Sequence, residues 1–329
     1  MILLTGATGF LGHNLVPRLL AAGYRVRALV RPSSDTHFLQ QHNVELAFAA
    51  DISDRAAVLA ACRGCAQVVH AAGHFRFWGD TPAFWQTNVG GTLAVLEAAA
   101  AVGVRRFVHI SSVAVVGRTP AGVIDETTRC RPLEPYQRTK LEAERLALRY
   151  WRDRGLPVVV LRPGAFYGPW GDYAFNRLFF TEPLRGWRIK VDGGRHVTFP
   201  VYVPDVVQGI LLALERGAAG GVYNISGESL THNEINAIVS DLAGIGQWRL
   251  SVPRALVLVL ARAWTAVSRF THREPFYPIN MAPYVFQDWQ VSSARAEREL
   301  GFQATPFVEG ARATLAWMQR AADGQRISG

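Results

Sequence analysis

The chain has 329 residues, 49% of them hydrophobic, which is enough to bury a sizeable core in one or two domains. It carries 35 basic and 26 acidic residues, for a formal net charge of +9. The arginines are scattered and form no run, so the charge predicts solvated helix faces and argues against nucleic-acid binding. Three cysteines exclude a disulfide framework, and we interpret the close pair Cys62 and Cys65 as the end of a helix.

Strand-like residues follow Met1 directly, without the pattern of a secretory signal peptide, so we expect a cytoplasmic protein. Short apolar runs then alternate with amphipathic stretches through the first half of the chain. They predict strands over residues 2–5, 26–30, 44–49, 68–71, 107–110 and 158–161, and helices over residues 11–22, 56–62, 92–102 and 140–154. This alternation predicts an α/β fold, a doubly wound parallel sheet of the Rossmann type.

After Pro169 the alternation becomes irregular and aromatic, and it returns only for a short stretch of helix and strand. We therefore expect a dinucleotide-binding domain over residues 1–168, to which residues 200–227 return. The remainder, residues 169–199 and 228–329, is predicted to form a smaller C-terminal substrate lobe.

The first predicted strand ends in Thr-Gly-Ala-Thr-Gly-Phe-Leu-Gly, a glycine-rich turn that opens the next helix. Glycine lets the backbone turn sharply and approach a pyrophosphate, whose charge is met by free N–H groups at the helix N-terminus. A glycine triplet alone is a weak signal, but this one lies at the strand-to-helix junction that dinucleotide binding requires. We predict cofactor contacts from Gly6, Thr8, Gly9, Phe10, Leu11 and Gly12.

The end of the second predicted strand indicates which dinucleotide is bound. NAD-binding folds usually place an acidic residue there, about 20 residues after the last glycine, to hold the ribose hydroxyls. This chain instead has Arg31, followed closely by Ser34. Arg31 can be a solvent-facing residue, but an arginine there can also pair with a 2′-phosphate while Ser34 supplies a hydroxyl. The sequence therefore predicts NADP(H) as the cofactor in preference to NAD.

Tyr136 and Lys140 lie four residues apart and therefore share one face of a predicted helix. A phenol ionises near ~10, and a nearby lysine cation is expected to lower the pKa of Tyr136. Tyr136 can then exchange a proton with a substrate oxygen, and Lys140 can hold the nicotinamide ribose. Ser111 and Ser112 follow an apolar strand at the carboxyl edge of the sheet, where ligands are expected, and Ser112 can hydrogen-bond the substrate oxygen.

In this combination and order, the glycine turn, the serines and the Tyr-x-x-x-Lys helix resemble the extended short-chain dehydrogenase/reductase family, which includes the NAD-dependent epimerases and dehydratases. The resemblance implies that Ser112, Tyr136 and Lys140 are catalytic, and that the protein dimerises through the helices before and after the fifth strand. It also implies cofactor contacts from Tyr136 and Lys140 and from Asp51, Ile52, Ala71, Ala72, Gly73, Ser111, Pro163, Gly164 and Phe166.

Two departures from the nucleotide-sugar members of that family bear on the substrate. Residues 162–165 read Arg-Pro-Gly-Ala where those members carry Arg-x-x-Asn, and residues 198–200 read Thr-Phe-Pro where they carry Arg-Asp-Phe. Both polar anchors for a diphosphate are missing, and the Arg-Pro pair resembles the hydroxysteroid dehydrogenase branch.

Aromatic residues gather in two other segments, residues 74–85 and 170–180, which are expected in loops at the cofactor edge. Besides Phe75, Trp78 and Tyr173, the set contains Phe77, Phe84, Trp85, Trp170, Phe175, Phe179 and Phe180. We expect an apolar or ring-shaped substrate. Its pocket is predicted to be lined by His74, Phe75, Trp78, Ala165 and Tyr173, although His74 fits a capping or packing role equally well.

The leading hypothesis is an NADP-dependent oxidoreductase that moves hydride between the nicotinamide and a secondary alcohol or ketone of a hydroxysteroid-like substrate. One alternative is a sugar epimerase or dehydratase with tightly held cofactor, and another is a non-catalytic NADP(H)-binding module. Intact Ser112, Tyr136 and Lys140 count against the binding module. No metal site is predicted.

Residues 252–270 contain seven consecutive apolar residues after Arg254, and Arg262 and Arg269 gather on the same side of a helix as Arg254. The segment is too short and too charged to span a bilayer, which takes about 20 apolar residues. We favour a helix packed over the pocket with its arginines in solvent. The alternative is an interfacial helix with weak, salt-sensitive membrane contact.

Overall fold

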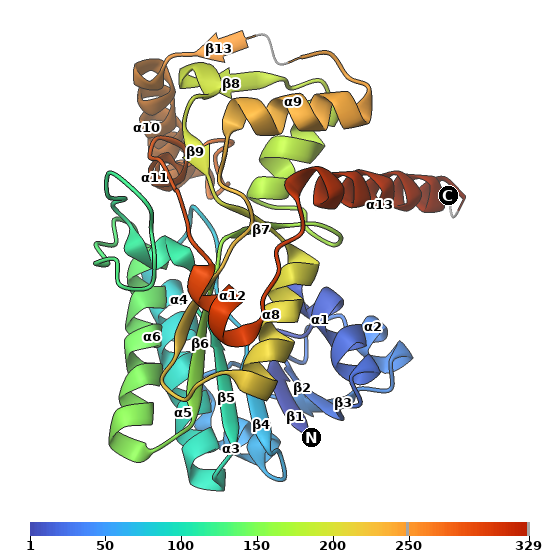
Figure 1. Ribbon diagram of the computed structural model, residues 1–329, viewed down its shortest axis with the longest axis vertical. Helices are drawn as coiled ribbons and strands as arrows, with labels where there is room; N and C mark the ends of the chain where they lie inside the picture. Colours follow the sequence, from blue (N-terminus) through green and yellow to red (C-terminus); the bar gives the residue numbers. More distant parts are fainter. Residues whose placement is uncertain (248–249, 328–329) are drawn as a thin grey trace.

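The computed structural model describes residues 1–247 and 250–327. A seven-stranded parallel sheet forms the lower half of the molecule in Figure 1, with strand order β11-β6-β5-β4-β1-β2-β3. Its strands are β1 (Ile2–Thr5), β2 (Val26–Val30), β3 (Glu45–Phe48), β4 (Gln67–His70), β5 (Arg106–Ile110), β6 (Val158–Pro163) and β11 (Val222–Ile225). The predicted doubly wound parallel sheet is confirmed, and each predicted strand agrees with an observed one to within two residues.

Helices cover both faces of this sheet, which explains why its strands read as continuous apolar runs. One face packs against α1 (Phe10–Ala21), α2 (His37–Gln41), α8 (Val203–Arg216) and α12 (Ala294–Leu300). The other packs against α3 (Arg55–Cys62), α5 (Gly91–Val102) and α6 (Pro135–Arg154). Dimerisation through α5 and α6 stays a prediction.

The two cysteines singled out in the sequence lie where α3 ends. Cys62 is the last residue of the helix and Cys65 lies in the turn after it, and both are buried. Burial raises the pKa of Cys62 to about 12 and also raises that of Cys65, so both thiols stay protonated. The interpretation of this pair as a helix end is confirmed.

The lobe above the sheet is built from small sheets and separate helices. Its strands pair as β7 (Ala165–Tyr167) with β10 (Pro200–Tyr202), β9 (Val197–Thr198) with β12 (Leu230–Thr231), and β8 (Ile189–Val191) with β13 (Leu250–Val252). Its helices are α7 (Glu182–Leu184), α9 (His232–Ala243), α10 (Arg254–Thr271), α11 (Ala282–Val285) and α13 (Phe307–Ile327). The short α4 (Thr81–Phe84) and a π-helical turn over 85–90 lead into α5.

Part of the aromatic set lies in the core of this lobe and not in a pocket. Phe175, Phe179 and Phe180 pack with Tyr167 and Phe307 beneath α9 and α13. The ring of Phe180 is fully buried. These three phenylalanines therefore stabilise the lobe, because large apolar side chains contribute most where they are removed from water.

Candidate active site

The turn between β1 and α1 makes two backbone approaches that only glycine allows. Gly6 has a positive φ of 75°, and a Cβ there would lie 2.8 Å from the backbone nitrogen of Ala72. A Cβ on Gly12 would lie 2.1 Å from the carbonyl oxygen of Ala7. Gly9 caps α1 without a side-chain hydrogen bond, which leaves the N–H groups of the first turn to bind an anion. This cradle fits the pyrophosphate of a dinucleotide.

The other predicted cofactor segments meet this cradle at the carboxyl edge of the sheet. Ala71, Ala72 and Gly73 follow β4, and the first two lie against Gly6. Phe10 and Leu11 begin α1 after the partly buried Thr8, and the Phe10 ring centroid lies 5.2 Å from that of Phe166 in β7. The structure therefore brings the ends of β1, β4 and β6 together.

Asp51 and Ile52 follow β3 at the same edge. Asp51 accepts hydrogen bonds from the backbone N–H of Ser53 at 2.8 Å and from its hydroxyl at 2.5 Å. These bonds, more than the positive charge of Arg31, lower the pKa of Asp51. Arg31 is exposed directly after β2, in a turn closed by the backbone bond from Ser34 to the Arg31 carbonyl, so its charge acts at the end where Asp51 lies.

Tyr136 lies in the first turn of α6, which begins five residues earlier than predicted. Glu134 caps this helix by accepting the backbone N–H groups of Tyr136 at 2.8 Å and Gln137 at 2.9 Å. Pro135 occupies the first helical position, where its missing N–H carries no penalty. The Tyr136 phenol hydrogen-bonds Ser112, whose own hydroxyl accepts the Ala114 N–H at 3.1 Å. The structure thus joins two of the three predicted catalytic side chains.

Lys140 lies one turn further along α6 and is buried. Its Nζ donates to the carbonyl oxygen of Ile110 at 2.5 Å, and a Cβ on Gly73 would lie 3.8 Å from the same Nζ. Burial lowers the pKa of Lys140 to about 8, against an opposing effect of Glu144. The ammonium is therefore positioned beside the Gly73 segment, where the nicotinamide half of a dinucleotide is expected.

The expectation that Lys140 lowers the pKa of Tyr136 is wrong. Burial raises the pKa of Tyr136 above its ordinary value, and the hydrogen bond with Ser112 opposes that rise. The lysine side chain is directed to the Ile110 carbonyl, so desolvation of the phenol is the larger effect. Tyr136 is a protonated phenol, suited to donating its proton.

Ser111 takes part in a buried network behind the catalytic residues. Its hydroxyl donates to Glu144 at 2.6 Å, and Arg162 donates to the same carboxylate at 3.0 Å and 2.5 Å. All three side chains are buried. The Ser111 hydroxyl is thus committed to Glu144, and a cofactor contact at this residue would have to come from its main chain.

Gly164 is closely packed against neighbouring backbone. A Cβ there would lie 2.4 Å from the Phe199 carbonyl oxygen, and the Gly164 N–H donates to Ile225 at 2.8 Å. Glycine is required at this position for contact with β10 and β11. Contact of Pro163 and Gly164 with a nicotinamide stays a prediction.

Four aromatic side chains, which we call the aromatic wall, stand beside Tyr136: Phe75, Phe77, Tyr173 and Tyr284. The ring centroid of Phe75 lies 4.7 Å from that of Tyr136 and 5.7 Å from that of Tyr173. Phe77 lies 5.2 Å from Tyr284, and its N–H donates to the Tyr173 hydroxyl at 3.0 Å. The predicted pocket residues Phe75 and Tyr173 are thus brought together, and Ala165 packs against the same buried cluster as Tyr284.

Two residues at the site, Tyr284 and Glu134, were not predicted from the sequence. Tyr284, from α11, donates its hydroxyl to Glu134 Oε1 at 2.8 Å and so ties the lobe to the cap of the catalytic helix. The Glu-Pro pair at 134–135 is a helix-start signal that marks the cap. No local pattern marks Tyr284, because its partners are distant in the chain.

Two predicted pocket residues are engaged elsewhere. The backbone of His74 is held by Asn88, which accepts its N–H at 2.7 Å and donates to its carbonyl at 3.1 Å, while the His74 ring packs edge-on against Phe84 at 4.5 Å. This is the packing role. Trp78 donates its indole N–H to Ser268 of α10 at 2.9 Å, so it connects the loop after β4 to the lobe.

The two remaining tryptophans of the aromatic set are exposed: Trp85 begins the π-helical turn, and Trp170 stacks on His13 with ring centroids 4.7 Å apart.

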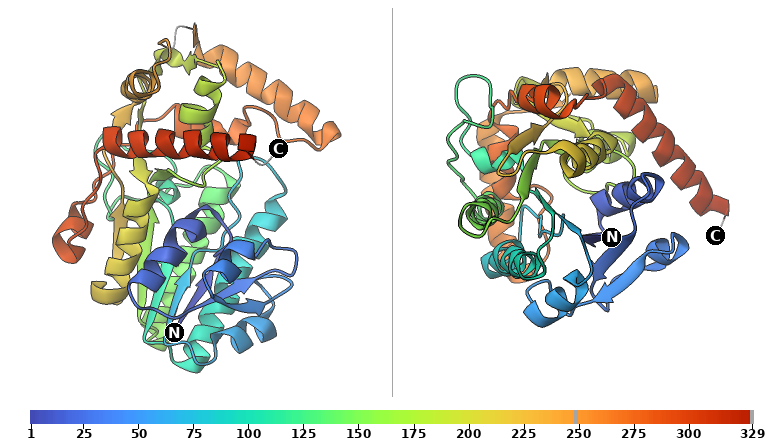
Figure 2. Two further views of the ribbon diagram at one scale, coloured as in Figure 1. Left: turned by 90° about the vertical axis from the view of Figure 1, so that its right-hand side faces the viewer. Right: turned by 60° about the horizontal axis from the view of Figure 1, so that its bottom comes forward.

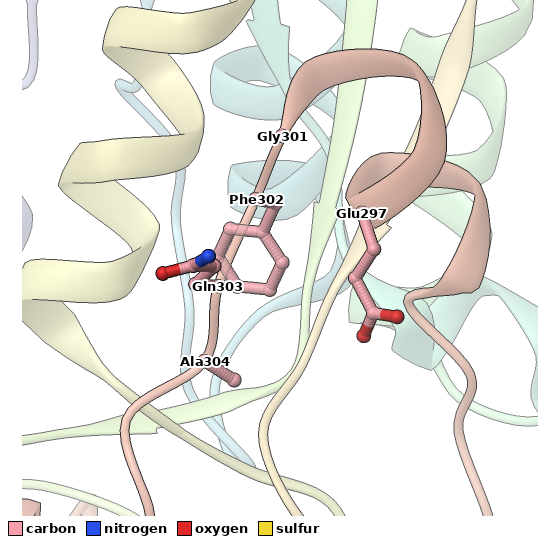
Figure 3. A pocket seen from close by; sticks show the side chains of 5 residues that line it. All are labelled: Glu297, Gly301, Phe302, Gln303 and Ala304. Atoms are coloured by element: carbon pink, nitrogen blue, oxygen red, sulfur yellow. The ribbon is translucent and has the colours of Figure 1, made fainter.

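A hollow beside the end of α12 is lined by Glu297, Gly301, Phe302, Gln303 and Ala304 (Figure 3). Its lining contains none of the predicted site residues, and Glu297 is the one ionisable side chain there, so we assign this hollow no role in the reaction.

A family model described as the NAD dependent epimerase/dehydratase family matches residues 2–226. The chain belongs to this family. It is 33% identical to sterol demethylase protein B of Methylococcus capsulatus, over 96% of this chain and 98% of that one. It is 31% identical to 4-hydroxy-2-methyl-3-oxo-4-farnesyl-3,4-dihydroquinoline-1-oxide ketoreductase of Stigmatella aurantiaca, over 91% and 90%.

Among solved structures, it resembles the dTDP-glucose 4,6-dehydratase DesIV from Streptomyces venezuelae, whose crystal contains NAD and TYD. The TM-score is 0.78 and the identity 27%, over 97% of both chains. The family and the relatives together make this chain an NAD(P)-dependent oxidoreductase of the epimerase/dehydratase family.

Proposed function

We propose that the enzyme catalyses NADP-dependent exchange of hydride between the cofactor and a ketone or secondary alcohol on an apolar, ring-shaped substrate of hydroxysteroid-like shape. The observation that carries the proposal is the aromatic wall beside Tyr136. Aromatic faces favour a flat apolar ring, whereas a nucleotide diphosphate needs cationic or polar donors. The names of the two relatives, a sterol demethylase protein and a ketoreductase of a farnesylated ring, agree with this substrate class.

The residues around the site divide the work of carbonyl reduction. NADPH, when bound, supplies the hydride that adds to the carbonyl carbon. Tyr136 donates its proton to the carbonyl oxygen, and Ser112 holds that oxygen and the phenol in line through its hydroxyl. Lys140, fixed by the Ile110 carbonyl, places a positive charge beside the Gly73 segment for the ribose hydroxyls and for the proton that Tyr136 must regain.

A sugar dehydratase is the second candidate, favoured by the likeness to DesIV. Elimination of water needs a general acid and a base next to the substrate. The two buried carboxylates of this helix and its cap are occupied, Glu134 as the cap and Glu144 in an ion pair with Arg162. The 3₁₀ turn over Val113–Val116, directly after Ser112, is wholly aliphatic. These features favour the reductase.

The test is turnover of a panel of cyclic ketones, including 3-ketosteroids, against dTDP-glucose. The proposal expects one NADPH consumed per ketone reduced, and no conversion of dTDP-glucose. Conversion of dTDP-glucose to a 4-keto-6-deoxy sugar without net consumption of cofactor would replace it by the dehydratase.

A further inference from the structure

The helix α10 buries one face in the lobe, as the favoured reading of the sequence expected. Val257, Ala261 and Ser268 are buried, and the first two pack in a cluster with Phe77 of the aromatic wall. The Ser268 hydroxyl accepts the Trp78 indole N–H. The inner face of α10 therefore holds the loop that carries Phe75 and Phe77 over Tyr136.

A second face of α10, about a third of a turn around the helix from the buried one, is also apolar, and it is exposed. We call it the outer stripe: Leu256, Val259, Leu260, Trp264, Val267 and Phe270. These positions recur at spacings of three and four, which places them on one side of a helix. Phe270 is 86% exposed and Val259 59% exposed, where an ordinary surface helix carries polar side chains. Large apolar side chains exposed together on one helix face indicate an interaction site.

The charge around the outer stripe has a single sign. Between Asp241 and Glu274 the sequence contains no acidic residue, and its charged residues are the arginines at 249, 254, 262, 269 and 273. Arg262 and Arg273 are exposed. Arg254 stacks on Phe286 of the lobe, so Arg262 and Arg273 are the exposed arginines in the described part of this segment that can meet headgroups. An exposed apolar helix face that carries a tryptophan, on a segment whose charged residues are arginines, matches the interface of an anionic bilayer, where cations meet headgroups and the apolar face enters the acyl boundary.

We propose that α10 docks on the surface of an anionic lipid bilayer through the outer stripe. Figure 2 shows α10 as the orange helix along the outer edge of the lobe, away from the sheet. Among the residues that the structure describes, no helix is long and apolar enough to cross a membrane. The helix therefore lies on the bilayer, with the long side chains of Arg262 and Arg273 reaching the phosphates.

A second copy of this chain is a poorer occupant. A symmetric dimer brings the same patch of both subunits together, so that Arg262 and Arg273 of one copy would approach the same arginines of the other. With no acidic residue between Asp241 and Glu274, these like charges would have no local partner across such an interface. Anionic lipid supplies the missing negative charge.

Docking through α10 sets the active site close beneath the membrane. The same helix contacts the bilayer on one face and the Phe77 cluster on the other, about one helix diameter, roughly 10 Å, away. On the proposed function, which this step requires, an apolar substrate dissolved in the bilayer has a short path to the aromatic wall.

The test is cosedimentation of the full-length protein with phosphatidylglycerol or phosphatidylcholine vesicles at low and high salt. We expect binding to phosphatidylglycerol at low salt, weaker binding at high salt and little binding to phosphatidylcholine. The triple variant Leu260→Gln/Trp264→Gln/Phe270→Gln should bind at least about tenfold more weakly. Arg262→Gln and Arg273→Gln should each weaken binding by about fivefold.

A matched control replaces three exposed apolar residues elsewhere, in Phe48→Gln/Val123→Gln/Val308→Gln, and should bind as the wild type does. NADPH affinity of every variant reports folding independently of turnover, so loss of the proposed ketone reductase activity leaves the vesicle result intact. Absence of wild-type binding in all four conditions, or equal binding by the outer-stripe variant, would overturn the proposal. If the wild type is a dimer that does not bind vesicles, and the outer-stripe variant is a monomer, the stripe is a dimer interface and not a membrane surface.

Discussion

The two walls of the active site are built by different forces. The wall formed by α6 and the end of β5 holds Ser112, Tyr136 and Lys140 through directional hydrogen bonds. The aromatic wall is assembled mainly by ring packing of three separate segments, at 75–77, 173 and 284, and hydrogen bonds hold only the two tyrosine hydroxyls at its edges. Directional bonds fix reacting atoms to within tenths of an ångström, whereas packing tolerates exchange of shapes. The chemistry should therefore be rigid and the substrate range adjustable.

The largest effect is expected from a change at Tyr136, in the hydrogen-bonded wall. Tyr136→Phe keeps the ring that packs on Phe75 but removes the proton, so turnover should fall by about 10²- to 10⁴-fold. Affinity for NADPH, measured by fluorescence titration, should be unchanged because the cofactor cradle is intact. Turnover of this variant near the wild-type rate would refute the assigned role of the phenol.

The pH dependence of NADPH affinity tests Lys140, in the wall formed by α6 and the end of β5. Burial lowers the pKa of Lys140 to about 8, and lysine is charged below its pKa, so NADPH affinity should be constant below about pH 8 and fall above it. Because kcat/KM reports the pKa values of the free enzyme, kcat/KM for NADPH should also fall above about pH 8, by up to about tenfold per pH unit. Lys140→Arg, which stays charged, should remove the fall in direct binding measurements. A wild-type profile flat to pH 10 would exclude a role for the lysine charge.

The choice between NADP and NAD tests Arg31, which is exposed at the carboxyl edge of the sheet and belongs to neither wall. Arg31→Asp should shift the ratio of NADP to NAD affinity by about tenfold or more, because it removes a charge-assisted bond to the 2′-phosphate and adds repulsion. Arg25→Asp, an exposed arginine just before β2 starts, changes the same net charge and should leave the ratio alone. The assignment of NADP fails if the wild type binds NAD more tightly.

The smallest expected effect lies where the two walls meet. Tyr284→Phe removes the hydrogen bond to Glu134 but keeps the ring against Phe77, so unfolding free energy should fall by about 1 kcal/mol and kcat by a few fold. Thermal unfolding and steady-state kinetics measure both. A loss of activity as large as that of Tyr136→Phe would make Tyr284 part of the chemistry and not of the support.

The same contrast explains what the sequence predicted. The sheet, the glycine turn and the Tyr136–Lys140 pair depend on local patterns of two to four residues, and all were found where expected. The aromatic wall depends on contacts between residues about 100 to 200 positions apart, such as Phe77 with Tyr173 and Tyr284, and local patterns carry no record of them. Phe180 in the lobe core and Phe75 at the site look alike in sequence, because both are simply aromatic residues in irregular segments.

The position of β11 bears on how the chain folds. β11 pairs with β6 at the edge of the sheet, yet about 60 residues of chain that build part of the lobe separate the two strands. During synthesis, the outer backbone edge of β6, an apolar strand that begins Val-Val-Val-Leu, stays unpaired until Val222–Ile225 have been made. An unpaired apolar edge is a template for aggregation. A fragment ending near Gly168 should therefore aggregate, and the nucleotide-binding half should depend on the rest of the chain for its solubility.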